Sequence, residues 1–344
     1  MSSHGPHPLL VTMGDPCGIG PEIVALAWAR GALGHVVVCA DAQVMRRALA
    51  AAGLQRPVAC IDSPADWSMV PDNALPVWQP PGLPPHLHQL PWGQITADAG
   101  AAAARCIEAA VAEVMAGRAS AIVTAPIHKE ALAAAGVPYP GHTEMLQALA
   151  AGHAGQAEAP PVRMMLANEE LRVVLVTIHV SLRRAIEMLD LPGVLQTLRI
   201  THAAAQGFGI ARPRIAVAGL NPHAGEGGLF GDEEQRIIGP AIAAARAEGI
   251  DATGPYAPDT VFMRARDAQG HPGEFDFVVA MTHDHGLIPV KFLGVEQGVN
   301  VTLGLPFVRT SPDHGTAFDL AGSGRADPSS LVAAARMARR LSAR

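Results

Sequence analysis

Short aliphatic runs alternate with helical patterns along most of this chain, and this alternation is its most restrictive feature. The order begins with a strand over residues 9–13, a helix over 21–30, a strand over 35–40, a helix over 43–52 and a strand over 57–61. Two strands joined through a helix pair in parallel, with the helix packed on the sheet. The alternation therefore predicts an α/β fold of layered, parallel sheets.

Later segments continue this pattern, with one hairpin and one irregular stretch. Residues 63–93 are rich in proline and predict a surface excursion, whereas an alanine-rich helix is expected over 96–117 with Thr96 or Asp98 near its cap. The apolar runs 163–167 and 171–178 flank Asn-Glu-Glu and predict a hairpin. We expect further strands at 121–124, 214–219, 275–281 and from 300, and helices through 135, after 144, from 182, from 194, at 233–247 and from 328.

The length of 344 residues favours about two domains. The composition shifts at the Pro-Tyr-Pro-Gly turn that begins at residue 138, and we place a domain crossing there. The prediction is a discontinuous first α/β domain formed by residues 1–135 and 305–344, and a second α/β domain formed by residues 136–304.

Charge and composition exclude several classes of protein. The net charge of −6 and the absence of a Lys/Arg run argue against nucleic-acid binding. No apolar run approaches the ~18 residues that a membrane span needs, and no secretory signal pattern opens the chain. The four cysteines form no C-x-x-C pair, which argues against a zinc ribbon or a disulfide framework. A soluble, cytoplasmic protein with reduced thiols is expected.

Three histidines share one position in this pattern, because each follows the end of an apolar strand. They are His179, His223 and His283. Ligands of open α/β sheets bind at the carboxyl ends of the strands, and three imidazoles leave coordination positions open for a substrate. Imidazole suits zinc and tolerates cobalt or nickel. The alternative is three unrelated loop histidines among 15, and the competing ligands are His128, His142, His285 and His314.

The segment from Asn300 to Thr316 carries the densest set of polar groups. A β-branched strand runs into a polar, glycine-bearing turn, which ends in a run able to open a helix. Arg309 follows apolar residues, and a buried guanidinium needs an anionic partner, either a structural carboxylate or a bound phosphate. Lys291 is either an anion clamp or a snorkelling surface lysine. Asp259 is a base, an acceptor for a substrate amine or a helix cap.

The glycine-rich loop at residues 14–21 lies between the first strand and the first helix. It matches neither G-x-G-x-x-G nor a Walker loop. Its spacing leaves open a cofactor role and a tight turn between strand and helix.

Six segments together resemble the PdxA family, the 4-hydroxythreonine-4-phosphate dehydrogenases of pyridoxal phosphate (vitamin B6) biosynthesis. They occur in order from about Leu9 to the last helix, at residues 14–22, 124–129, 141–144, 219–228, 283–286 and 299–317. The resemblance implies a two-domain α/β/α layered fold similar to isocitrate and isopropylmalate dehydrogenases, which bind NAD without a Rossmann fingerprint. It also implies a homodimer, with each active site in the cleft between the domains and at the subunit boundary.

The same resemblance assigns ligands. It implies one divalent metal (zinc, magnesium or cobalt) held by His179, His223 and His283, with ligands drawn from both subunits. Substrate contacts are expected from His142, Thr143, Lys291, Asn300 and Arg309. The NAD or NADP pocket is expected to include Asn300, Thr310, Asp313, His314 and Gly315.

The implied reaction oxidises the C3 hydroxyl of 4-phosphooxy-L-threonine with NAD⁺. The product is a β-keto acid, which loses CO₂ to leave 3-amino-2-oxopropyl phosphate. The metal would lower the pKa of the hydroxyl as a Lewis acid. We look for the general base among Asp284, Asp259 and Lys291.

Two residues depart from the family pattern, and related enzymes with other substrates suggest alternative functions. His285 stands where glutamine is usual, and Cys17 stands where alanine is usual. Related dehydrogenases oxidise dihydrodiols of aromatic dicarboxylates or phosphorylated sugar acids. A phosphorylated substrate is favoured here by the presence of Lys291, Asn300, Arg309 and Thr310. A metallohydrolase and a non-catalytic phosphate- or metal-binding protein are the alternatives from other classes.

Overall fold

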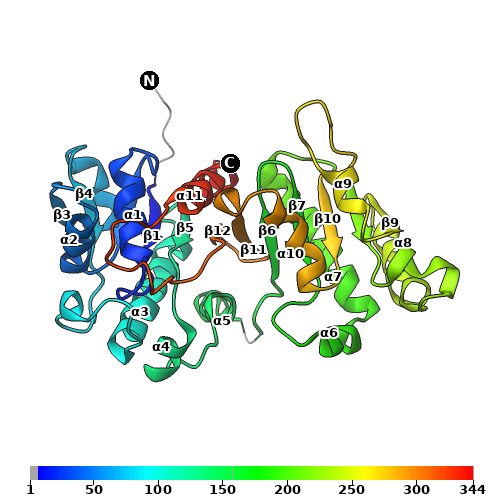
Figure 1. The fold of residues 1–344 in the computed structure, drawn as a ribbon, viewed down its shortest axis with the longest axis horizontal. Coiled ribbons are helices and arrows are strands. Elements are labelled where there is room, and N and C mark those ends of the chain that lie inside the picture. Colours follow the sequence, from blue (N-terminus) through cyan, green and yellow to red (C-terminus); the bar gives the residue numbers. More distant parts are fainter. Residues whose placement is uncertain (1–6, 157, 344) are drawn as a thin grey trace. The chain divides into compact units, whose positions relative to one another are not determined.

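The computed structural model describes residues 7–156 and 158–343, and it divides into two compact units (Figure 1). The first unit is formed by Met1–Pro161 and Leu305–Arg344, and the second by Val162–Gly304. The division thus falls after Pro161 and not near residue 136. The reason is that helix α5 (His142–Ala154) packs against α3 (Ala97–Met115) of the first unit.

The first unit is built on a parallel set of strands in the order β3-β4-β2-β1-β5-β12. Every residue of β1, β2, β5 and β12 is buried, as expected for parallel strands covered on both faces. The bounds are β1 Leu9–Thr12, β2 Val36–Cys39, β3 Val58–Ile61, β4 Leu75–Trp78, β5 Ala121–Thr124 and β12 Arg309–Pro312.

Helices cover both faces of these strands (Figure 1). Ile122 of β5 packs into the cluster formed with α3, whereas Thr310, the register partner of Val123, donates to the Ala334 carbonyl of α11 at 2.8 Å. The predicted cap of the long helix is confirmed, because Thr96 Oγ1 accepts from the Ala99 N–H at 3.1 Å. The remaining helices of this unit are α1 Gly20–Ala29, α2 Ala42–Ala51, α4 Lys129–Ala134 and α11 Ser329–Ser342.

The second unit has a mixed set of strands in the order β11-β6-β7-β10-β8-β9. The predicted hairpin is confirmed, with Met165 opposite Val174 in an antiparallel pair. Strand β11 also pairs antiparallel with β6, and the remaining pairs are parallel. The bounds are β6 Arg163–Ala167, β7 Arg172–Leu175, β8 Ile215–Ala218, β9 Ala252–Tyr256, β10 Phe277–Ala280 and β11 Val299–Leu303.

The helices of the second unit complete its layers, and the α/β prediction is confirmed. Val278 of β10 packs in one apolar cluster with Leu287 of α10, whereas the neighbouring Phe277 meets Phe208 of the short turn η3 (Ala205–Phe208) that follows α7. None of the described helices has the length and hydropathy of a membrane span. The helices are α6 Leu182–Met188, α7 Leu191–Ala204, α8 Gly239–Ala247, α9 Val261–Ala265 and α10 His283–Phe292.

Four local predictions were incomplete or wrong. The proline-rich stretch 63–93 contains strand β4, which lies between β3 and β2 in the sheet. Strand β9 and helix α10 were not predicted. The turn after β12 continues through further turns to residue 323 and opens no helix.

Candidate functional site

His179 and His283 lie side by side because β7 and β10 are parallel neighbours that end together. Beyond the strands, the Thr177 N–H and the Thr177 hydroxyl donate to the Met281 carbonyl at 3.3 and 2.8 Å. The two imidazole centroids are 5.6 Å apart. The structure thus brings two of the three strand-end histidines together at the carboxyl edge of this sheet.

A pocket of about 250 Å³ surrounds this pair. Its wall includes the loop after β7, the start of α6 and the first turn of α10. His283 Nδ1 lies 2.8 Å from Asp284 Oδ1, a carboxylate–imidazole contact of the kind that orients metal-bound histidines. His285 lines the same pocket, and its buried Nδ1 has no hydrogen-bond partner among the described residues, so it stays a competing ligand.

His223 occupies a different setting, on the loop η4 (Pro222–Gly228) after β8. Its backbone is left-handed, with φ of +53°, and its side chain is 66% exposed. Its neighbours are Phe230, with ring centroids 6.2 Å apart, and Glu226, whose Oε2 is 3.7 Å from His223 Nδ1. Across residues 7–156 and 158–343, no three His, Cys, Asp or Glu side chains gather as metal ligands do.

The other unit carries a buried cation. Arg309 opens β12 beside β5, is 3% exposed, and donates from Nε and Nη2 to Thr124 Oγ1 at 3.1 and 2.6 Å. Burial lowers the pKa of Arg309 to about 9, so the guanidinium is still protonated at neutral pH. Burial, and then the charge of Arg309, hold the pKa of His142 well below its usual value.

His142 therefore presents a neutral imidazole at the start of α5. Its buried Nε2 has no hydrogen-bond partner within the described residues, and Thr143 follows it in the first turn of the helix. A protonated guanidinium near an imidazole with an open nitrogen is suited to binding an anion such as a phosphate or a carboxylate.

Hydrogen bonds to α11 hold the polar turn after β12 and the end of the strand before it. The Thr310 hydroxyl is already engaged with α11, and the Asp313 N–H donates to Ser330 Oγ at 3.0 Å. His314 Nδ1 lies 3.0 Å from the carbonyl of Gly315, which is exposed. The Thr310 side chain is completely buried, so its hydroxyl holds β12 to α11.

The glycine-rich loop lies against this turn, because the Ile19 N–H donates to the Thr316 carbonyl at 2.9 Å. Gly14 has a φ of +72°, and a Cβ there would stand 2.3 Å from the Pro126 carbonyl oxygen, so only glycine is accommodated. Asp15 in this loop was missed in the sequence. It is fully buried, and one carboxylate oxygen accepts from the Cys17 N–H at 2.8 Å.

The second oxygen of Asp15 has no partner within the described residues. Burial raises the pKa of Asp15, against the opposing effects of the Cys17 N–H and His128. A buried, half-satisfied carboxyl is a functional-site signal in a structure, but in the sequence it is one aspartate in a Gly-Asp-Pro turn.

The remaining predicted residues are partly or fully exposed. Asp284 and Lys291 are seven residues apart on α10, which places them on one face about 10 Å apart along the axis. Asn300 is half-buried on β11, opposite Leu166. Asp259 is exposed and precedes α9, whose N-cap is Thr260 without a side-chain cap, so the capping role is not seen.

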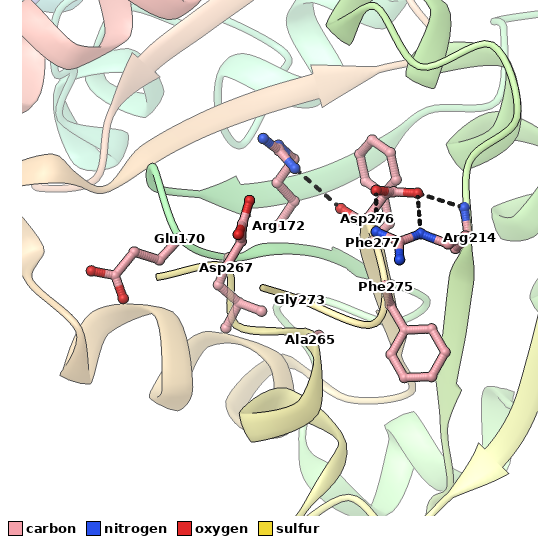
Figure 2. Close-up of a pocket in the computed structure, with 10 residues that line it drawn as sticks. Glu170, Arg172, Arg214, Ala265, Asp267, Gly273, Phe275, Asp276 and Phe277 are labelled. Carbon is pink, nitrogen blue, oxygen red and sulfur yellow. Dashed lines mark hydrogen bonds and ion pairs between the residues drawn. The ribbon is translucent and has the colours of Figure 1, made fainter. Parts of the chain in front are cut away.

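A second pocket lies at the other end of the same strands and is shown in Figure 2. Its volume is only about 30 Å³. Arg214 binds Asp276 through Nε and Nη2 at 3.1 and 3.0 Å, and Arg172 Nη1 donates to the Asp276 carbonyl at 3.3 Å (Figure 2). Its small size, and its place at the amino ends of β7 and β10, favour a structural role.

One α/β unit carries two imidazoles at the carboxyl edge of its strands, and the other carries a buried arginine near an imidazole. These groups suit an α/β enzyme that acts on small anionic substrates. A sequence profile of the "Pyridoxal phosphate biosynthetic protein PdxA" family matches residues 32–338. The chain belongs to this family.

Named relatives match over nearly the whole chain. A "4-hydroxythreonine-4-phosphate dehydrogenase" of Beijerinckia indica is 56% identical over 97% of this chain and 95% of its own length. A "D-threonate 4-phosphate dehydrogenase" of Pectobacterium atrosepticum is 44% identical over 97% and 98%. The crystal structure of a 4-hydroxythreonine-4-phosphate dehydrogenase from Klebsiella pneumoniae is 45% identical, covers 98% of this chain and 99% of its own, and gives a TM-score of 0.85.

Proposed function

We propose that this protein is an NAD-dependent, metal-assisted dehydrogenase that oxidises 4-phosphooxy-L-threonine at C3 in the cytoplasmic synthesis of pyridoxal phosphate. The observation that carries the proposal is the 56% identity, over 97% of the chain, to a relative named for this substrate. The buried Arg309 and the neutral His142 agree with it, because the substrate bears a phosphate.

His179, His223 and His283 are the proposed ligands of one divalent cation. The fit rests on the two adjacent imidazoles at the pocket and on Asp284, which holds the ring of His283. When bound, zinc, magnesium or cobalt supplies Lewis-acid polarisation of an alcohol or carbonyl oxygen. His223, on its exposed loop, is proposed to serve the site of a second subunit.

The chain's own side chains bind and orient the two organic ligands. Arg309, His142 and Thr143 are proposed to bind the substrate phosphate, and Lys291 and Asn300 to contact the rest of the substrate. The nicotinamide nucleotide (NAD or NADP) is proposed to lie against residues of the turn after β12 and of β11. This second set is Asn300, Thr310, Asp313, His314 and Gly315.

The overall chemistry balances without a further reagent. The C3–H bond breaks with its electron pair, and hydride passes to NAD⁺ while the hydroxyl proton goes to a base. Asp284 and Lys291, on one face of α10, are favoured for that base over Asp259, which lies in an exposed turn. The bond between C1 and C2 of the β-keto acid then breaks, CO₂ leaves, and the electron pair stays on the enolate, which takes up one proton at C2 to give 3-amino-2-oxopropyl phosphate.

A second substrate has specific support. The relative from Pectobacterium atrosepticum is named for D-threonate 4-phosphate, which carries a hydroxyl at C2 where 4-phosphooxy-L-threonine carries an amine. Both present a phosphate to Arg309 and a secondary alcohol at C3. The two therefore differ in the contact made at C2.

The test is to incubate the purified protein with NAD⁺, a divalent metal and each of the two substrates, and to follow reduced nicotinamide and released CO₂. We expect faster turnover of 4-phosphooxy-L-threonine, lost on chelation and restored by metal.

His223→Ala should abolish metal-dependent turnover while circular dichroism shows an intact fold. The control is His153→Ala on the exposed face of α5. Full activity of metal-stripped His223→Ala enzyme would remove the metal from the proposal.

A further inference from the structure

The loop that carries His223 has an unusual backbone. Five consecutive residues from His223 to Gly227 have positive φ, between +43° and +81°. Glycine adopts this region freely, but His223, Ala224 and Glu226 carry a Cβ that crowds the backbone there. Non-glycine residues persist in such a conformation only when the surrounding structure imposes it.

One buried carboxylate holds the start of this loop. Glu234 is 4% exposed, and its Oε1 accepts from the Leu220 and Asn221 backbone N–H groups at 2.7 and 2.8 Å. Its Oε2 accepts from Asn221 Nδ2 at 2.9 Å. Both oxygens thus accept hydrogen bonds from Leu220 and Asn221, which Pro222 alone separates from the left-handed turn.

The same carboxylate is closely enclosed by glycines of the loop. A Cβ at Gly225 would stand 2.8 Å from Glu234 Oε2, and a Cβ at Gly219 would stand 3.0 Å from Glu234 Oε1. Glu234 itself opens the π-helical turn η5 (Glu234–Ile238), and such turns often mark functional sites. The loop and this turn are built around one side chain.

The geometry points to Glu234 as a positioning residue that fixes the left-handed loop and thereby the direction of His223. This inference rests on the proposed role of His223 as a metal ligand. Glu234 touches no substrate, cofactor or metal in this assignment. It acts through Asn221 on the backbone that aims the imidazole.

The charge and both oxygens of Glu234 matter to this role. Burial raises the pKa of Glu234, but the hydrogen bonds from Asn221 and Leu220 outweigh burial and keep the pKa below its usual value. A glutamine of the same shape has one acceptor oxygen, and its amide N–H₂ would face the donors of Asn221, donor against donor. Glu234→Gln therefore removes the charge and the acceptor for Asn221 Nδ2, keeps one oxygen for the two backbone N–H groups, and creates no cavity.

The experiment compares Glu234→Gln with a matched neighbour, Asp232→Asn. Asp232 also carries a carboxylate, but it is exposed and forms an ion pair with Arg236 across one helical turn. Two quantities are measured on the full-length protein: amide hydrogen exchange over residues 219–231 without metal, and the affinity for Co²⁺ from its visible absorption. Asn221→Ala, which removes only the side-chain contacts, is the second variant should Glu234→Gln fold poorly.

We expect Glu234→Gln to speed exchange in the loop and to weaken Co²⁺ binding about 10-fold or more, as loss of outer-shell support does in metal sites. Asn221→Ala should change both quantities in the same direction but less, and Asp232→Asn should change neither. Wild-type Co²⁺ affinity or unchanged loop exchange in Glu234→Gln would overturn the inference. Wild-type Co²⁺ affinity in His223→Ala would instead remove the metal assignment, while the metal-free exchange would still decide whether Glu234 holds the loop.

Discussion

Arg309 is the residue whose charge and burial best suit the binding of a phosphate. It is almost fully buried, its hydrogen bonds to Thr124 are to a neutral hydroxyl, and burial lowers its pKa to about 9. Burying a cation costs free energy unless a charge or strong acceptors compensate it. A bound phosphate would add a charged acceptor to the partners of this guanidinium when substrate is present.

Arg309→Ala should therefore discriminate between substrates. We expect kcat/KM for 4-phosphooxy-L-threonine to fall by about 30- to 1000-fold, which corresponds to roughly 2–4 kcal/mol for loss of a buried charged partner. The non-phosphorylated analogue 4-hydroxy-L-threonine should lose little. Steady-state kinetics on both substrates measure the difference.

The control for Arg309→Ala is a second arginine of the same unit. Arg47 is half-buried and donates to the carbonyls of Pro16, His88 and Leu90, which is a structural use. Arg47→Ala should lower the melting temperature without changing the preference between the two substrates. Equal losses on both substrates in Arg309→Ala would argue against an anion site.

Among the elements, α10 carries most of the proposed chemistry, and one glycine sets its distance from the sheet. A Cβ at Gly286 would stand 2.3 Å from Leu175 Cδ2, 2.9 Å from Val173 Cγ1 and 3.2 Å from Ala280 Cβ. These atoms belong to the buried strands β7 and β10. The helix therefore lies as close to the strands as a glycine allows.

Gly286→Ala should displace α10 and destabilise the protein by about 1–3 kcal/mol, the usual cost of overpacking a core. Because His283 lies one turn away on the same helix, the His179–His283 spacing should change, and Co²⁺ affinity should fall with it. Gly152→Ala in α5 is the matched control, since nothing lies within 4 Å of its Cβ position and alanine favours a helix. Chemical denaturation and Co²⁺ titration test both variants. Equal stability of Gly286→Ala and Gly152→Ala would show that the space between α10 and the strands accommodates a methyl group.

The same elements show which parts of the fold can be predicted from the sequence. Strands β1, β2 and β5 were predicted because parallel strands buried on both faces read as unbroken apolar runs. Strand β4 was missed because Pro76 stands in it and prolines flank it, and β9 because it contains Gly254-Pro255. Helix α10 begins with His-Asp-His and contains Pro289, so its helical period is obscured, and packing of Leu287 and Val290 supplies the stability.

Parts of the candidate site can also be predicted from the sequence, because the predicted strands fix where the residues after them lie. Residues that follow predicted strands, such as His179 and His283, can be expected at one edge of a parallel sheet. The left-handed backbone at His223 and Ala224 could not be predicted, because alanine disfavours it and the contacts of Glu234 with residues 220 and 221 join segments that are distant in the sequence. The buried state of Asp15 likewise depends on Pro126 and Cys17 packing around it.

At the scale of the whole molecule, exposed apolar side chains lie on α6 and α10, the two helices whose first turns line the histidine pocket. Leu182 of α6 is 65% exposed, and Ile288 and Phe292 of α10 are 64% and 90% exposed. Large apolar side chains gathered beside a polar pocket are typical of a protein–protein interface. We therefore place the proposed homodimer contact here, which would bring His223 of one protomer toward the His179–His283 pair of its partner.

The dimer and the metal should then be lost together. Phe292→Glu buries a charge in this contact and should weaken self-association by at least about 100-fold, or roughly 3 kcal/mol, as seen by sedimentation. Co²⁺ affinity should fall in the same variant, since two imidazoles bind a cation less tightly than three. Met69→Glu, at a site 81% exposed on the first unit, should change neither quantity. A monomeric Phe292→Glu protein with wild-type Co²⁺ affinity would show that each protomer completes its own site, whereas a Phe292→Glu protein that still dimerises would show that the exposed face of α10 is not the contact.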